Sequence, residues 1–324
     1  MGNIWSQFIS IPTPSLTEKN CPDQTGRVFF VTGGYTGVGL ALCKILYSHN
    51  ASVYIAGRNK TKAAKAISEI DKSSSPGSNG GRVKFVSLDL SDLSTIKPAV
   101  EKFLAQEQRL DVLVNNAGVM YPPKGSTNAQ GHELQMETNC LGHYLLYRLL
   151  RPILLTTAST TTTTTTTTNK SDVRVLWAAS VAMHVATPHA HGLVLEPNNN
   201  NRPKDLGVEP NYAQTKVGNA FLARECAKRD SDTGIAHVAF NPGNLRTELQ
   251  RNWSGLDHWF TDTFLLHPSI YGAYTELWAA LAPEVSAPNN KSGALPKGIE
   301  SAISEHGVAA KFVAWCEGET KALM

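Results

Sequence analysis

The stretch RVFFVTGGYTGVG, residues 27–39, decides the fold. It opens with the apolar run Arg27–Thr32, which is typical of a buried strand, and it leads into Gly37–Ser48, where apolar residues recur on one face of a helix. A strand that runs through Thr-Gly-x-x-x-Gly-x-Gly into a helix is the setting in which a glycine-rich turn binds a dinucleotide. We expect Gly33 to allow the tight turn, Gly37 to let the backbone approach the pyrophosphate, and Gly39 to let helix and strand pack closely. The helix N-terminus supplies free amides and partial positive charge for the anion.

Strand-like and helix-like segments alternate along the rest of the chain. Further strands are predicted at 51–56, 83–88, 112–115, 173–178 and 235–240, and further helices at 61–70, 93–106, about 131–155 and 212–229. Such alternation implies right-handed crossovers and a parallel sheet covered on both faces. The sequence therefore predicts an α/β fold, a single Rossmann-like doubly wound parallel sheet. An irregular leader, residues 1–26, precedes one dinucleotide-binding catalytic domain, residues 27–324.

Two low-complexity segments interrupt this pattern. Nine threonines fill positions 160–168, and four asparagines fill positions 198–201. Both segments fall between predicted elements, where insertions are tolerated. We therefore predict a threonine-rich surface loop at 156–171 and an asparagine-rich loop at 196–210. An O-glycosylated threonine stalk is disfavoured, since the N-terminus does not resemble a secretory signal.

Bulk properties exclude several classes of protein. Of the 324 residues, 41% are hydrophobic and 18% are charged, and the formal net charge is +3. This balance indicates a globular protein and argues against a nucleic-acid partner, because no basic run or interleaved aromatic stripe occurs. No apolar stretch is long enough to span a bilayer. The five cysteines contain no Cys-x-x-Cys pair, so we interpret them as reduced thiols in a cytoplasmic protein.

Two weaker patterns are also consistent with chance. Residues 1–6, MGNIWS, fit the N-myristoylation pattern with Gly2 as acceptor, although one acyl chain binds a membrane only marginally. His184, His189 and His191 follow one another closely, but no further ligands accompany them, so no metal is expected.

The stretch YAQTK, residues 212–216, carries the strongest sign of chemistry. On a helix, Tyr212 and Lys216 lie one turn apart on the same face. An ammonium there favours the phenolate, so we expect Lys216 to lower the pKa of Tyr212 and allow proton exchange. Together with the glycine turn, this predicts hydride transfer from a nicotinamide coupled to proton transfer from a tyrosine.

The end of the second strand predicts which nicotinamide is used. NAD sites carry an acidic residue there for the ribose 2′-hydroxyl, but segment 56–60 reads AGRNK and contains no acid. Arg58 can instead bind a 2′-phosphate, and Lys62 adds positive charge, so NADP (NADPH) is the expected cofactor. Asp89, after the third strand, is placed for the adenine edge, and the small residues of NNAG, 115–118, let the backbone pass under the cofactor.

These motifs occur in the order that defines a known family. After the glycine motif come NNAG, Ser180 after a strand, Tyr212 and Lys216 on a helix, and Pro242-Gly243 after the next strand. The chain resembles the short-chain dehydrogenase/reductases, from about Arg27 to beyond Thr247. Gly-Arg-Asn at 57–59 and the long connection from Ser180 to Tyr212 resemble its retinol-dehydrogenase-like branch. Segment 241–249, NPGNLRTEL, is closest in pattern to fungal members, many of which serve secondary metabolism.

The resemblance implies a role for each matching residue. Tyr212 is the proton donor and acceptor, Lys216 holds the nicotinamide ribose, Ser180 binds the substrate oxygen, and Asn139 holds a water that links Lys216 to solvent. Pro242 and Gly243 line the nicotinamide. The implied cofactor-binding set is Thr32, Gly33, Gly37, Val38, Gly39, Arg58, Lys62, Asp89, Leu90, Asn115, Ala117, Gly118, Tyr212, Lys216, Pro242, Gly243, Leu245 and Thr247.

The family also implies a substrate lid, expected at about 244–270. Trp253, Trp259, Phe260 and Phe264 fall inside it and either face a bulky apolar substrate or pack in the core. Segment 292–298, SGALPKG, is a diluted form of the family's last strand and turn.

The expected function is NADP(H)-dependent interconversion of a carbonyl and an alcohol on a bulky apolar small molecule. Two alternatives stay open: a non-catalytic dinucleotide-binding regulatory protein, and a dehydratase or cyclase on the same scaffold. A homo-oligomer also stays open.

Overall fold

The computed structural model describes residues 13–72, 81–164, 172–185, 191–245, 266–285, 297–304 and 307–324. Within these residues a six-stranded sheet has the order β3-β2-β1-β4-β5-β8, and every neighbouring pair is parallel. The strands are β1 (Val28–Thr32), β2 (Ser52–Gly57), β3 (Arg82–Ser87), β4 (Val112–Asn115), β5 (Val173–Ala178) and β8 (Ile235–Phe240). The predicted doubly wound parallel sheet is confirmed.

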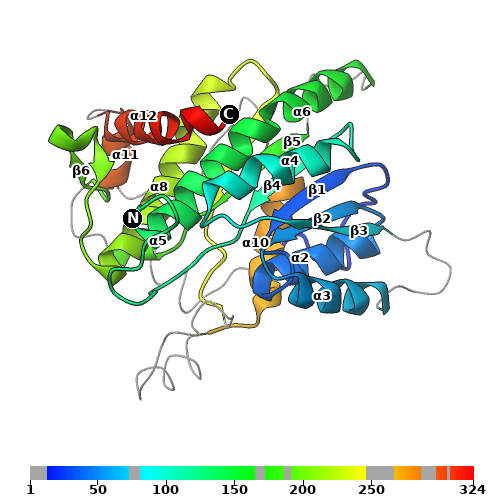
Figure 1. Ribbon diagram of the computed structural model, residues 1–324. Coiled ribbons are helices and arrows are strands. Elements are labelled where there is room, and N and C mark those ends of the chain that lie inside the picture. The colour runs from blue at the N-terminus through cyan, green and yellow to red at the C-terminus, as the bar shows by residue number, and fades with distance from the viewer. Residues whose placement is uncertain are drawn as a thin grey trace.

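Helices cover both faces of this sheet (Figure 1). One layer contains α2 (Gly37–Ser48), α3 (Lys60–Lys72) and α10 (Ser269–Leu281), and the other contains α4 (Ile96–Leu104), α6 (Gly142–Thr164) and α8 (Val208–Arg229). Each layer encloses its own hydrophobic cluster against the sheet. Outside α8 lie α11 (Lys297–Ser304) and α12 (Val308–Thr320). Their apolar residues belong to the hydrophobic cluster under α4, α6 and α8. The sequence patterns did not predict α10, α11 or α12.

Shorter elements join these layers. They are η1 (Leu93–Thr95), α5 (Leu134–Met136), the π-helical turn η2 (Glu137–Leu141), α7 (Ala182–Val185), β6 (Leu195–Glu196), η3 (Pro197–Asn199), β7 (Arg202–Pro203) and η5 (Lys321–Leu323). The single long helix predicted at 131–155 is therefore α5, η2 and α6 in succession. A π-turn inside a helix often marks a functional position, and this one contains Asn139.

The predicted threonine-rich loop is wrong at its start, because α6 continues to Thr164. The hydroxyl of Thr157 donates to the carbonyl of Ile153 at 2.8 Å, and that of Thr160 donates to Thr156 at 3.2 Å. Thr157 also accepts the amide of Leu110 at 3.0 Å, so it is anchored to the body of the protein. A helix can accommodate threonine hydroxyls that bond to carbonyls one turn earlier, and α6 continues through these residues. Residues 165–171 lie outside the described residues.

The predicted asparagine-rich loop is also partly wrong, because it holds the β6–β7 hairpin and α8 begins at Val208. Asp205 accepts the amide of Gly207 at 2.9 Å and the side chain of Asn211 at 2.7 Å. The Asn211 side chain also accepts the amide of Leu206 at 2.9 Å. These bonds start the helix one turn before Tyr212. The bonds link residues on both sides of the helix start, so the apolar periodicity of the sequence does not reveal them.

One acidic side chain lies in the core between α10 and α2. Glu276 has no exposed surface, and neither carboxylate oxygen has a hydrogen-bond partner. Burial raises its pKa from 4.5 to about 8. The folded protein therefore keeps Glu276 protonated at pH values where the unfolded chain has lost that proton.

We predict that Glu276→Met stabilises the protein most at pH 8 and progressively less toward pH 4.5. A raised pKa in the folded state means that wild-type stability falls as pH rises between the unfolded and folded values, by up to about 1.4 kcal/mol per pH unit. Urea unfolding at a series of pH values measures this difference. Glu101→Met, at an exposed position of α4, is the matched control and should show no such trend. A stability difference that does not depend on pH would contradict the prediction.

Candidate active site

The site lies along the carboxyl edge of the sheet. All six strands run parallel, so the residues after β1, β2, β4, β5 and β8 meet at this edge. The strand order reverses between β1 and β4, since β2 lies on one side of β1 and β4 on the other. In open α/β sheets, ligands bind outside the carboxyl ends of the strands at such a switch point.

The glycine turn stands at this point and fits a diphosphate. Gly33 and Gly37 have φ of +68° and +55°, which favours glycine. A Cβ on Gly39 would lie 2.9 Å from the carbonyl oxygen of Gly33, so only glycine packs there. Thr36, the N-cap of α2, makes no side-chain capping bond, which leaves the first amides of the helix available to an anion.

Thr32 lies beneath the turn and organises it. Its side chain is buried, and its hydroxyl accepts the amides of Asn116 at 3.0 Å and Ala117 at 3.0 Å. The hydroxyl also lies 3.0 Å from Nε2 of His143. Thr32 therefore connects β1 to the turn after β4 through hydrogen bonds, and its side chain lies buried beneath the glycine turn.

His143 is a site residue that the sequence patterns missed. Burial lowers its pKa to about 4, so the ring is neutral. Its Nδ1 lies 3.1 Å from the carbonyl oxygen of Asn139, which can only accept, so Nδ1 carries the proton. Nε2 is then the acceptor that faces the Thr32 hydroxyl. The available signal was its position one turn after Asn139.

Asn139 holds the chain after β4 in place through hydrogen bonds. Its Oδ1 accepts the amide of Val119 at 2.8 Å, and its Nδ2 donates to the carbonyl of Val119 at 3.0 Å and to Oγ1 of Thr215 at 3.1 Å. A Cβ on Gly118 would lie 3.2 Å from Oδ1 of Asn139 and 4.0 Å from Nζ of Lys216. Gly118 therefore keeps the space between these two side chains open. Asn139 and Lys216 are therefore neighbours across Gly118, and the water-holding role of Asn139 stays a prediction.

Lys216 and Tyr212 project from the N-terminal half of α8 toward the end of β5. Nζ of Lys216 donates to the carbonyl of Ala178 at 3.1 Å and lies 5.3 Å from the centroid of the Tyr212 ring. Nδ2 of Asn219 donates to the same carbonyl at 2.8 Å. Ser180, two residues beyond Ala178, hydrogen-bonds to the Tyr212 hydroxyl. Ser180, Tyr212 and Lys216, three of the four residues expected to be catalytic, therefore lie together.

The expected lowering of the Tyr212 pKa by Lys216 is wrong. Burial raises the pKa of Tyr212, ionisation of Tyr121 would raise it further, and the hydrogen bond with Ser180 only partly opposes them. Burial also lowers the pKa of Lys216 to about 8. Helical spacing reveals the ammonium but not the loss of hydration, which is the larger effect here. Tyr212 is therefore protonated at neutral pH, the form that donates a proton.

Three residues expected near the adenine end of the cofactor, Arg58, Lys62 and Asp89, lie after β2, on α3 and after β3. Arg58 follows β2 and is exposed, as is Lys62 on α3. Oδ1 of Asp89 accepts the amide of Ser91 at 3.0 Å and its hydroxyl at 2.6 Å. These bonds hold the Asp89 carboxylate beside β3.

The other expected cofactor residues divide by burial. Asn115, at the end of β4, is fully buried, and neither polar atom of its side chain has a hydrogen-bond partner. Val38, Gly39, Leu90 and Leu245 are also buried, whereas Gly33, Gly37, Ala117, Gly118 and Pro242 are half-buried and Gly243 is exposed. The amide of His267 donates to the carbonyl of Asn244 at 2.9 Å beside the start of α10.

Several sequence predictions lie outside the described residues. They concern Gly2, Thr247, the lid aromatics at 253, 259, 260 and 264, the stretch from 292 to 296, and His189.

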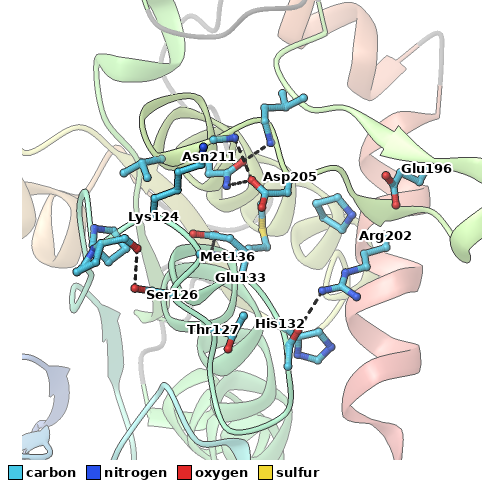
Figure 2. Close-up of a pocket in the computed structure, with 18 of the residues that line it drawn as sticks. Lys124, Ser126, Thr127, His132, Glu133, Met136, Glu196, Arg202, Asp205 and Asn211 are labelled. Atoms are coloured by element: carbon cyan, nitrogen blue, oxygen red, sulfur yellow. Dashed lines mark hydrogen bonds between the residues drawn. The ribbon is translucent and has the colours of Figure 1, made fainter.

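A cavity of about 590 Å³ opens beside the N-terminus of α8 (Figure 2). Its walls come from the chain after β4, the β6–β7 hairpin and α12, and they include Pro122, Met136, Leu206 and Trp315. Many of its polar groups already have partners. Asp205 accepts from Asn211, Ser126 donates to Pro123, and Arg202 donates to the carbonyl of Gly131 at 3.2 Å. The rest of the wall is mixed, because the charged residues Lys124, Glu133 and Glu196 line it together with the apolar ones.

In the part of the chain that the structure describes, no cluster contains three or more His, Cys, Asp or Glu side chains arranged to hold a metal ion. Among the described helices, none combines the length and apolarity that crossing a bilayer requires. All five cysteines are buried and free.

A glycine turn at the switch point of a doubly wound sheet, beside a serine, a tyrosine and a lysine, defines an oxidoreductase that uses a nicotinamide dinucleotide. The chain belongs to the short-chain dehydrogenase/reductase family, whose family model, described as short chain dehydrogenase, matches residues 27–190. A short-chain dehydrogenase/reductase of Phomopsis amygdali is 41% identical over 99% of this chain and 97% of that protein. The enzyme pkfC of Emericella nidulans is 40% identical over 96% of this chain and 98% of its own length. The expected likeness to fungal members is confirmed.

Solved structures show the same fold at lower identity. A protein from Mycobacterium paratuberculosis superposes with a TM-score of 0.65 at 23% identity, covering 94% of this chain and 97% of that one. The Pseudomonas aeruginosa RhlG/NADP complex has a TM-score of 0.61 at 20% identity, covering 81% of this chain and 92% of that one. A 3-ketoacyl-(acyl-carrier-protein) reductase from Brucella melitensis, complexed with NADH, has a TM-score of 0.57 at 23% identity, covering 80% and 92%.

Proposed function

We propose that this protein is an NADP(H)-dependent oxidoreductase that interconverts a carbonyl and an alcohol on a bulky, largely apolar small molecule. The observation that carries the proposal is the meeting of Ser180, Tyr212 and Lys216 beside the glycine turn. The hydrogen bond between Ser180 and Tyr212 places two hydroxyl groups together where one substrate oxygen can contact both.

The chemistry follows from these groups. When bound, the nicotinamide supplies or accepts the hydride. As a carbonyl is reduced, its oxygen gains negative charge, which the hydroxyls of Ser180 and Tyr212 stabilise by donating hydrogen bonds. Tyr212, protonated because of its burial, then transfers its proton to that oxygen. Lys216, held at the carbonyl of Ala178, places positive charge beside the phenolate that forms.

The chain offers no acid after β2 and an exposed Arg58, which supports NADP over NAD. A guanidinium can bind a phosphate through two parallel hydrogen bonds. Related folds carry either cofactor, as the RhlG complex with NADP and the Brucella reductase complex with NADH illustrate. The preference therefore depends on this chain's own residues at the end of β2.

We predict that Arg58→Ala lowers the ratio of kcat/KM for NADPH over that for NADH by about tenfold to a hundredfold, the loss of one charge-assisted contact of roughly 1.5–3 kcal/mol. Steady-state kinetics with both cofactors and one ketone measure the ratio. Lys65→Ala, which removes an exposed cation on α3, is the matched control. If wild type prefers NADH, or if Arg58→Ala leaves the NADPH-to-NADH ratio of kcat/KM unchanged, Arg58 does not bind the 2′-phosphate.

The biological setting belongs to the same proposal. Fungal relatives that match nearly the whole chain support a role in fungal secondary metabolism. Five buried, unpaired cysteines support a reducing compartment, the cytoplasm. The partner is the small-molecule substrate, and the volume of the cavity beside α8, about 590 Å³, supports a bulky one.

The proposal is tested by incubating the purified protein with NADPH and a panel of ketones and aldehydes, following absorbance at the nicotinamide band and identifying products. We expect alcohol formation matched to NADPH consumption. NADPH binding without turnover on any carbonyl would instead favour a regulatory protein. Product formation without net NADPH consumption would favour a dehydratase or cyclase.

A further inference from the structure

Tyr121 has an unusual backbone for its residue type. Its φ is +51°, and the other described non-glycine residues with positive φ are all asparagines, Asn50, Asn200 and Asn201. A bulky side chain in the left-handed region is unfavourable, and such strain persists where the surroundings impose it, often at functional sites. The structure around Tyr121 must therefore hold it in place.

The clamp that holds it comes from Gln135. Oε1 of Gln135, a fully buried residue, accepts the amide of Tyr121 at 3.0 Å. Nε2 of the same side chain donates to the carbonyl of Val208 at 2.8 Å, at the start of α8. Gln135 thus connects the strained residue directly to the helix that carries Tyr212.

Two further side chains continue this arrangement at four-residue intervals. Gln135 accepts the amide of Tyr121, and Asn139 hydrogen-bonds to both the amide and the carbonyl of Val119. His143 contacts the hydroxyl of Thr32. The chain after β4 is therefore pinned on both sides of Met120. This pinning fixes where the Tyr121 side chain emerges.

The ring of Tyr121 emerges against the ring of Tyr212. The two ring centroids lie 5.6 Å apart with an interplanar angle of 76°, an edge-to-face contact. Such pairs contribute more than their buried area alone, and they restrict ring orientation. Tyr212 keeps only 7% of its surface exposed, and the Tyr121 ring is part of what covers it.

We propose that Tyr121 is a positioning residue for Tyr212. The strained backbone and the hydrogen bonds of Gln135 hold the ring of Tyr121 in place. This ring excludes water from the Tyr212 ring and keeps the Tyr212 hydroxyl directed at Ser180. The inference rests on the proposed acid–base role of Tyr212. It assigns no contact with substrate to Tyr121, and it requires the ring of Tyr121 but not its hydroxyl.

Three substitutions separate this role from a merely structural one. Tyr121→Phe keeps the ring, whereas Tyr121→Ala and Tyr121→Gly both remove it. Glycine adopts positive φ freely, so Tyr121→Gly should melt at a higher temperature than Tyr121→Ala. We expect kcat for ketone reduction to fall about tenfold in both ring-less variants, as for a modest loss of transition-state stabilisation, with KM for NADPH unchanged. Tyr121→Phe should stay within about twofold of wild type by the same measure.

A second readout needs no substrate. In protein labelled at the tyrosine ring carbon that bears the hydroxyl, the carbon-13 NMR signal of Tyr212 is assigned by its absence from Tyr212→Phe. In wild type and Tyr121→Phe it should not titrate by about pH 10, the ordinary pKa of tyrosine, because burial opposes ionisation. In Tyr121→Gly, water reaches the ring, so titration should begin within that range. Tyr271→Ala, which removes an exposed tyrosine ring, is the matched control.

The outcomes separate the inference from the proposed reaction. Equal losses of kcat in the alanine and glycine variants despite different melting temperatures, with an earlier Tyr212 titration, support the positioning role. An unchanged kcat and an unchanged titration in Tyr121→Gly overturn it. If wild type reduces no carbonyl while the titration still shifts in Tyr121→Gly, the proposed reaction fails and the positioning of Tyr212 stands.

Discussion

Tyr212→Phe is expected to bind NADPH as wild type does and to lose nearly all turnover. The phenylalanine ring occupies the same buried space against Tyr121, but the proton that the substrate oxygen needs is gone. A positioned general acid contributes about 10²–10⁴-fold to the rate, so kcat should fall by that order. NADPH oxidation with the best ketone of the panel measures turnover, and quenching of protein fluorescence measures cofactor binding.

Tyr271→Phe provides the matched control for this experiment. Its ring is 41% exposed on α10, so removal of its hydroxyl should leave both turnover and binding unchanged. If Tyr212→Phe kept activity within a few-fold of wild type, another group would have to supply the proton. The assignment of Tyr212 as acid and base would then be wrong.

The second large effect is expected on stability, at a buried carboxylate far from the carboxyl edge. Asp230, just after α8, has no exposed surface and accepts hydrogen bonds from Tyr147 at 2.6 Å, from Nε of Arg151 at 2.9 Å and from Nε2 of His237 at 2.9 Å. Trp177 donates to the other nitrogen of His237 at 3.3 Å, so that nitrogen carries no proton. His237 is therefore neutral, in agreement with the lowering of its pKa by burial.

Asp230→Leu is expected to lower the free energy of unfolding by roughly 3–5 kcal/mol, the usual cost of removing one partner from a buried charged network. The substitution leaves the donors of Tyr147, Arg151 and His237 without their acceptor. Urea unfolding at neutral pH measures the loss. Asp232→Leu, at an exposed position two residues later, is the control, and an equal loss there would contradict the network's role.

This network also sets a dependence on pH. Burial alone would raise the pKa of Asp230, but the hydrogen bonds from His237, Tyr147 and Arg151 outweigh it and lower the pKa from 3.8 to about 2. A lowered pKa means that the stabilisation is present above pH 3.8 and is lost as pH falls toward 2. The difference between wild type and Asp230→Leu should therefore shrink in acid.

Local sequence determined the parts of this protein that depend on neighbouring residues. The bounds predicted for α2, β4, β5 and β8 agree with the structure, because continuous apolar runs and helical spacing are local properties. The glycine turn and the Tyr212–Lys216 spacing were equally readable, since each fits within a few residues. Their order along the chain was enough to predict both the fold and the family.

Tertiary structure decided what depends on distant partners. Residues 156–160 are helical where the sequence predicted a loop, and there the hydroxyl of Thr157 accepts the amide of Leu110, which is distant in sequence. His143, Gln135 and Tyr121 carry no motif, and only packing brings them to Thr32, Val208 and Tyr212.

The protonation state of Tyr212 shows the same division most clearly. Helical spacing places a lysine beside the tyrosine and predicts a lowered pKa, but the folded chain buries both side chains and raises the pKa of Tyr212. Proximity of two residues along a helix is a property of sequence. Loss of hydration is a property of everything that packs around them, and in this site it has the larger effect.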